Sequence, residues 1–101
     1  MKADISSYLR SHGVSLRVGG TSERGFTQRE IFELLELLSE SHLPPLGLEV
    51  WRSSSGGEFR IDSLAGWVPS SSLSFDESFA EVKKVVAAEI QRAPSVFTLQ
   101  F

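Results

Sequence analysis

The chain has 101 residues, of which 41% are hydrophobic and 23% are charged, a balance that predicts one globular domain, residues 1–101. A domain of this size buries about two-thirds of the surface that its unfolded chain exposes, which leaves little room for an enclosed substrate pocket. Its 13 acidic and 10 basic residues give a net charge of −3, and no cluster of lysine and arginine favours nucleic-acid binding.

The sequence contains no cysteine, which excludes disulfides and thiolate chemistry and is typical of a reducing compartment. We therefore expect a cytoplasmic protein. Met1-Lys2-Ala3-Asp4 does not match a signal peptide, and no apolar run approaches the ~20 residues of a membrane span. No association with membranes is expected.

A short helix is predicted over residues 5–11, because three apolar side chains recur at helical spacing and Gly13 supplies a left-handed cap. Residues 14–18 then alternate apolar and polar side chains. This alternation predicts a short extended piece, either an edge strand or a loop, with a turn at Gly19-Gly20.

Two capping boxes mark the starts of two long helices. Thr27 with Glu30 begins a helix from residue 28 to about residue 41, and Ser74 with Glu77 begins one that ends at about Arg92. Each helix carries an apolar stripe at helical spacing, which predicts one buried face. The stripes are Ile31, Leu34, Leu35 and Leu38 in the first helix, and Phe79, Val82, Val86 and Ile90 in the second.

An antiparallel hairpin is predicted between the long helices, because two runs alternate with period two on either side of turn residues 53–57. The first strand carries Leu46, Leu48 and Val50 on one face, and Glu49 and Trp51 on the other. The second strand has Phe59 and Ile61 as its apolar residues. If the apolar residues of both strands share a face, Glu49, Trp51, Arg60 and Asp62 share the opposite one, where Glu49 pairs with Arg60.

The end of the chain supplies further extended segments. Trp67 is a candidate for a third short strand, and residues 95–101 alternate as a closing strand with Phe97, Leu99 and Phe101 on one side. The order of elements predicts an α+β fold, with a mainly antiparallel sheet of three to four strands that has two long helices and the short N-terminal helix on one face. The closing strand is a candidate for pairing with another chain.

The sequence shows no catalytic centre. His12 and His42 lie at predicted helix ends without partners at metal-ligand spacing, and no serine lies in a nucleophile motif. The Gly-Gly pairs lack the pattern of phosphate-binding loops. We therefore expect a protein that is not an enzyme and has no catalytic, cofactor-binding or metal-binding residues.

An interaction surface is the remaining hypothesis. Glu49, Trp51 and Asp62 on one predicted face combine acidic and aromatic side chains, as binding hot spots often do. Trp67 either joins this face or belongs to the core. A second acidic surface is expected on the solvent side of the first long helix, at Glu33, Glu36 and Glu40. The alternative interpretation of Glu49 and Asp62 is that they are ordinary solvated strand positions.

Several segments of the chain resemble the predicted immunity proteins of bacterial polymorphic toxin systems, specifically the family numbered forty. The resemblance covers nearly the whole length. It rests on Gly13-Val14-Ser15-Leu16-Arg17, the leucine-rich helix after Phe26-Thr27, the strand Pro45-Leu46-Gly47-Leu48-Glu49-Val50, Trp67, and a final helix followed by a strand. The family's strand has glycine and aspartate where this chain has Leu48 and Glu49.

This resemblance implies a cytoplasmic antidote that binds a cognate protein toxin domain and neutralises it by stoichiometric occlusion. An acidic surface would suit a toxin that is basic because it acts on nucleic acid, and would speed association. The alternatives are a homo-oligomeric interaction or adaptor domain, for instance a homodimer, and a small enzyme or ligand-binding protein whose site is not visible in the sequence.

Overall fold

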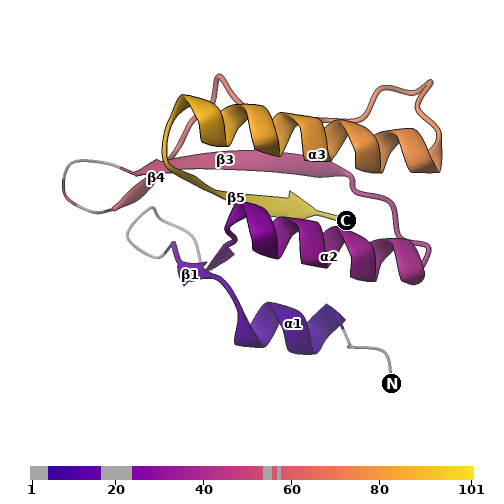
Figure 1. Cartoon of the computed structure of the whole chain (residues 1–101), viewed down its shortest axis with the longest axis horizontal. Coiled ribbons are helices and arrows are strands. Elements are labelled where there is room, and N and C mark those ends of the chain that lie inside the picture. The colour runs from indigo at the N-terminus through magenta and orange to yellow at the C-terminus, as the bar shows by residue number, and fades with distance from the viewer. Residues whose placement is uncertain (1–4, 17–23, 54–55, 57) are drawn as a thin grey trace.

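The computed structural model describes residues 5–16, 24–53, 56 and 58–101, which form an α+β fold (Figure 1). The helices in these ranges are α1 (Ile5–Ser11), α2 (Gln28–Glu40) and α3 (Phe75–Arg92). An antiparallel sheet has the spatial order β4 (Phe59–Ile61), β3 (Gly47–Ser53) and β5 (Ser95–Gln100), and a smaller antiparallel pair joins β1 (Val14–Ser15) to β2 (Arg24–Gly25). The predicted fold class is confirmed.

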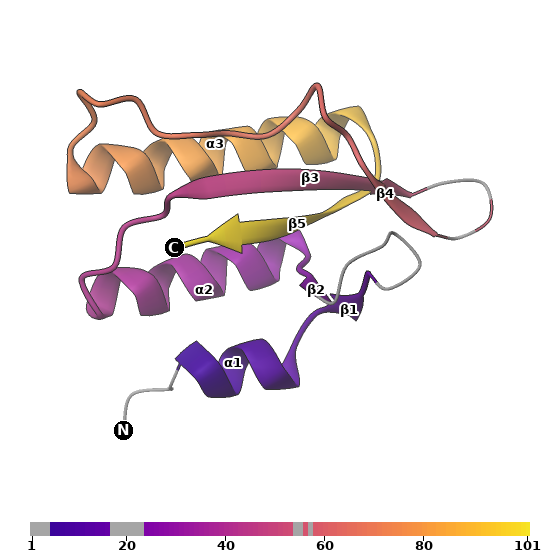
Figure 2. The same cartoon turned by 180° about the vertical axis from the view of Figure 1, so that it is seen from behind.

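The two long helices lie side by side on one face of the three-stranded sheet, and α1 packs against the outer side of α2 (Figure 1). Figure 2 shows the sheet from behind, where no helix of the described chain covers the strands. None of these helices combines the length and apolarity that a membrane crossing needs.

Both predicted capping boxes are present. The hydroxyl of Thr27 accepts a hydrogen bond from the backbone N–H of Glu30, whose carboxylate accepts one from the N–H of Thr27; Ser74 and Glu77 repeat the arrangement. These reciprocal bonds satisfy N–H groups that lack partners within the helix. Gly13 has a φ of +92°, as its predicted capping role requires.

The main core lies between the sheet and the long helices. It contains the predicted stripes of α2 and α3, of which Ile90 is only partly buried, together with the residues of β3 and β5 whose side chains point toward the helices. On the strands these residues are Leu48, Val50 and Phe97, with Leu99 partly buried beside them.

A second, smaller core lies on the opposite face of the sheet. Trp51 and Val96 face each other across β3 and β5 and are buried with Leu16, while Phe59 packs against them. Gly25 of β2 comes so close that a Cβ atom there would lie 2.5 Å from the Cγ2 atom of Val96. The β1–β2 pair is therefore packed tightly against this cluster.

Several local predictions need correction. Leu46 precedes β3 and is 55% exposed, and the short strand β2 was not predicted. Trp67 makes an isolated bridge to Leu48 rather than a full strand. The predicted turn at Gly19-Gly20 lies outside the described residues, as do positions 54, 55 and 57 of the predicted hairpin turn.

Candidate protein-binding site

The register of the β3–β4 hairpin separates the residues of the predicted acidic, aromatic face. Asp62 donates its backbone N–H to the carbonyl of Val50 at 2.8 Å, which places Asp62 on the helix-covered side. Trp51 lies on the other side and is only 4% exposed. The prediction that Glu49, Trp51 and Asp62 share an accessible face is therefore wrong.

The physical reason is the position of the apolar residues of β4. Ile61 is opposite Trp51, and Phe59 packs against the second core, so neither shares a face with Leu48. A register shift by one residue moves every side chain of a strand to the other face. The predicted pairing of Glu49 with Arg60 is wrong for the same reason.

Glu49 instead bonds to the neighbouring strand. Its carboxylate accepts hydrogen bonds from the Thr98 hydroxyl at 2.9 Å and from the Gln100 side-chain amide at 3.3 Å. The indole N–H of Trp51 donates to the same Thr98 oxygen at 3.4 Å. These bonds tie β3 to β5. They also engage the polar groups of Glu49 and Trp51, two of the predicted binding residues, within the domain.

Asp62 belongs to an ion cluster around Arg52. The guanidinium contacts the Asp62 carboxylate at 3.1 Å and the Glu89 carboxylate at 2.7 Å, and it donates to the Ser95 hydroxyl at 2.8 Å. The hydrogen bond to Glu89 raises the pKa of Arg52. The backbone N–H of Leu64 and then the Arg52 guanidinium hold the pKa of Asp62 below its usual range. Through Arg52 of β3, this cluster joins α3 to the residue after β4 and to the first residue of β5.

The acidic surface predicted on α2 is smaller than expected. The Tyr8 hydroxyl donates to the Glu33 carboxylate at 2.6 Å, which lowers the pKa of Glu33, while burial raises the pKa of Tyr8. Arg29 lies 3.7 Å from the same carboxylate. Glu33 therefore fastens α1 to α2, and of the three predicted carboxylates only Glu36 and Glu40 are exposed.

Trp67 also has its polar group engaged. Its backbone N–H and C=O both bond to Leu48, and its indole N–H donates to the Glu81 carboxylate at 2.9 Å. The ring is partly buried against the main core. Of the two alternatives for Trp67, the core is the one that the structure supports.

Both histidines lie at helix ends, as predicted. His12 stacks on the Tyr8 ring with 3.9 Å between centroids, and His42 follows the end of α2 with a φ of +57°. In the described ranges, no three His, Asp or Glu side chains gather closely enough to hold a metal ion.

An open strand edge is the feature that stands out for recognition. The N–H and C=O of Leu48 both bond to Trp67, on the β4 side of β3, so its partner Leu99 receives no main-chain bond from Leu48. In an antiparallel pair such residues direct their main-chain groups away from each other. The N–H and C=O of Leu99 thus point outward from β5, and no residue that the structure describes bonds to them.

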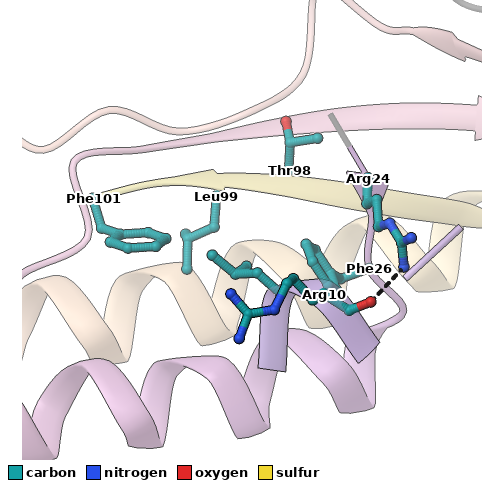
Figure 3. Close-up of a pocket in the computed structure, with 7 residues that line it drawn as sticks. Arg10, Arg24, Phe26, Thr98, Leu99 and Phe101 are labelled. Carbon is teal, nitrogen blue, oxygen red and sulfur yellow. Dashed lines mark hydrogen bonds between the residues drawn. The ribbon is translucent and has the colours of Figure 1, made fainter. Parts of the chain in front are cut away.

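A groove of about 570 Å³ runs along this edge, between β5 and α1 (Figure 3). Its volume lies within the ~300–1,000 Å³ range of ligand clefts. Phe101, at one end, is 40% exposed. The residues that line the groove are Leu9, Arg10, Arg24, Phe26, Thr98, Leu99 and Phe101.

Two arginines supply the charge of the groove. Arg24 donates to the backbone carbonyl of Arg10 at 3.2 Å (Figure 3) and to that of His12, also at 3.2 Å, at the end of α1. Arg10 bonds weakly to the Ser7 hydroxyl at 3.4 Å. Neither guanidinium forms an ion pair within the described part of the chain.

The sequence indicated this site only in part. The alternation of residues 95–101 predicted the closing strand and its capacity to pair with another chain, and β5 is indeed an edge strand of its sheet. The contribution of Arg10 and Arg24 was missed, because no local pattern brings residues from two distant segments to one strand edge.

Comparisons with known proteins add no assignment. No protein-family model, curated protein or solved structure matches this chain. The resemblance to immunity proteins therefore stays a prediction.

Proposed function

We propose that this chain is a non-catalytic cytoplasmic domain that binds another protein along the outer edge of β5. In its specific form, the proposal is that the chain is an immunity protein that neutralises a toxin domain by covering it. The observation that carries the proposal is the pair of unbonded main-chain groups at Leu99, beside a groove with apolar and cationic walls.

An unpaired strand edge supports binding for a simple physical reason. Its N–H and C=O groups form a ready template for another strand, and most proteins protect such edges with charge, proline or a covering segment. Here α1 leaves a groove instead of closing the edge, and Phe101 offers exposed aromatic surface beside it. Main-chain bonds would supply affinity and the apolar walls would supply selectivity.

The exposed carboxylates on α2 would contribute to the rate of association with a partner. Glu36 and Glu40 have no ion pair within the described chain, and the whole chain is negative. Such charges accelerate encounters with a basic partner without needing to lie at the centre of the contact. We assign them a role in the encounter and not in the contact, because no residue of α2 lines the groove at β5.

The second candidate is a homodimer in which two β5 strands pair. The same open edge favours it, because an antiparallel pairing of identical strands is compatible with twofold symmetry. Sedimentation velocity of the purified chain distinguishes the two candidates. A monomer over the micromolar range would favour recognition of a different protein, and a dimer would favour self-association.

The test of the immunity proposal begins with gene order. A gene immediately downstream of a large secreted protein with a variable C-terminal domain would support it, and an isolated gene would count against it. That C-terminal domain is then co-expressed with this chain, and growth and co-purification are measured. Failure of the wild-type chain to restore growth or to co-purify would contradict the proposal.

Variants locate the contact. Leu99→Pro removes the outward N–H without removing a bond to β3, because that N–H points away from β3. Proline is tolerated on edge strands, and this variant should abolish co-purification. Arg60→Glu is the matched control, because Arg60 is an exposed arginine on β4, at the opposite edge of the sheet. It should co-purify like the wild type. Equal recovery of both variants would exclude the β5 edge as the contact.

A further inference from the structure

We infer that the β5 groove takes an extended peptide segment of the partner as an added strand, with acidic side chains of that segment at Arg10 and at Arg24. This inference rests on the proposed function and specifies its ligand. It joins three observations: main-chain groups without partners, apolar walls and two guanidinium groups without ion pairs.

The domain itself shows that this edge accepts a strand. Phe26 and Phe97 exchange two backbone hydrogen bonds, at 2.7 and 2.8 Å, in an antiparallel bridge. The bridge is a single pair, and the two preceding residues, Gly25 and Arg24, pair with β1. An incoming segment can continue the interaction at Leu99, the next outward-pointing residue of β5.

The walls of the groove suit alternating side chains. Successive side chains of an added strand point to opposite sides, so every second one would face the groove. Leu9, Phe26 and Phe101 supply apolar surface there. We therefore expect apolar residues at every second position of the bound segment, with polar residues between them.

The charge of the groove selects for an acidic segment. Arg24 is fixed at the end of α1 by two carbonyl contacts that use only its Nη1 atom, and a guanidinium has five N–H donors in all. Guanidinium groups bind carboxylates through short, charge-assisted hydrogen bonds. A peptide carboxylate fits better than a nucleic-acid phosphate, because the open edge at Leu99 offers main-chain groups that match a peptide backbone.

The experiment is a selection from a random peptide library displayed on phage, with the wild-type chain as target. Enriched peptides should alternate apolar and polar residues and contain Asp or Glu. In fluorescence anisotropy, a selected peptide with that residue changed to the corresponding amide should bind about 3- to 10-fold more weakly. Arg10→Glu should weaken the parent peptide to a similar extent, and raised salt should reduce the difference.

Controls keep a folding defect from imitating a binding defect. Arg60→Glu should bind the parent peptide like the wild type, and circular dichroism should show native helix content in every variant used. In the wild type, NMR hydrogen exchange at the Leu99 amide should slow when the peptide is added. This last measurement requires no substitution.

Four results would contradict the inference. An absence of selected peptides, a lack of acidic preference, or full binding by Arg10→Glu would overturn the inference. A dimer that Leu99→Pro dissociates would also overturn it, because a second copy would then fill the edge. A different pair of results would contradict the proposed function alone. In that case the selected peptides require Asp or Glu for binding, but the toxin domain binds Leu99→Pro as well as the wild type.

Discussion

Replacing Arg52 by methionine should lower the free energy of unfolding by about 2–3 kcal/mol. Arg52 binds the Glu89 carboxylate at 2.7 Å and the Asp62 carboxylate at 3.1 Å. Glu89 is only 7% exposed, so the variant leaves a carboxylate that is nearly buried without its main partner. The remaining cation, Arg92, is largely exposed and lies 3.8 Å away.

The magnitude follows from the position of the cluster. Removing one partner of a fully buried ion pair costs about 3–5 kcal/mol, whereas exposed pairs contribute about 1 kcal/mol or less. The side chain of Arg52 is 21% exposed, so we place the cost toward the buried limit but below it. A second substitution, Glu89→Leu, should recover most of the loss, because it removes the carboxylate that was left unpaired.

Urea unfolding followed by tryptophan fluorescence measures these differences, since Trp51 is buried and Trp67 is partly buried. Arg60→Met is the matched control, because Arg60 is opposite Arg52 in the register but its side chain is 75% exposed. We expect it to change stability by less than about 0.5 kcal/mol. A loss of that small size for Arg52→Met, or a double variant no more stable than the single one, would refute the reasoning.

Three further predictions concern packing, pH and the strand edge. Gly25→Ala should destabilise the domain by about 1–3 kcal/mol in urea unfolding, because the new Cβ would lie 2.5 Å from Val96; unchanged stability would contradict the close packing. The lowered pKa of Asp62 adds stability that is present above its ordinary pKa and lost as pH falls through the lowered value. Asp62→Asn should therefore flatten the acid limb of stability against pH, and a limb of unchanged slope would oppose this. In the free chain the amide of Leu99 should exchange faster than that of Thr98, and equal protection would contradict the open edge.

The sequence was most informative where structure depends on neighbours along the chain. Each capping box satisfies N–H groups within three residues, so Thr27 and Ser74 marked the starts of α2 and α3 correctly. The buried stripes were equally local, since the face of a helix follows from its 3.6-residue period. Even the left-handed Gly13 could be expected from its place after α1.

The faces of the sheet could not be predicted in the same way. Alternation predicted that Glu49 and Trp51 share one side of β3, and they do. It did not give the pairing register of β3 with β4, which decides which residues of the two strands share a face. Because Phe59 and Ile61 are apolar, we predicted that they face the main core. They lie instead on the sheet face of the second, smaller core. A second core was unexpected because it depends on β1 and β2 approaching from a distant segment.

The proposed binding edge depends on the same kind of long-range information. Strand order decides that β5 lies at the edge, and the bonds of Leu48 to Trp67 decide that Leu99 points outward. The contributions of Arg10 and Arg24 follow only once α1 and β2 are placed beside β5. The sequence could therefore propose a strand that pairs with another chain, but not the chemistry beside it.

The most direct test of the account is hydrogen exchange of the Leu99 amide in the purified complex with the co-expressed toxin domain. If the partner adds a strand to β5, exchange at Leu99 should slow by at least about 10-fold relative to the free chain. The amide of Asp62, which bonds to Val50 within the sheet, serves as the internal reference. An unchanged rate at Leu99 in a fully formed complex would contradict the claim that the open edge is the binding site.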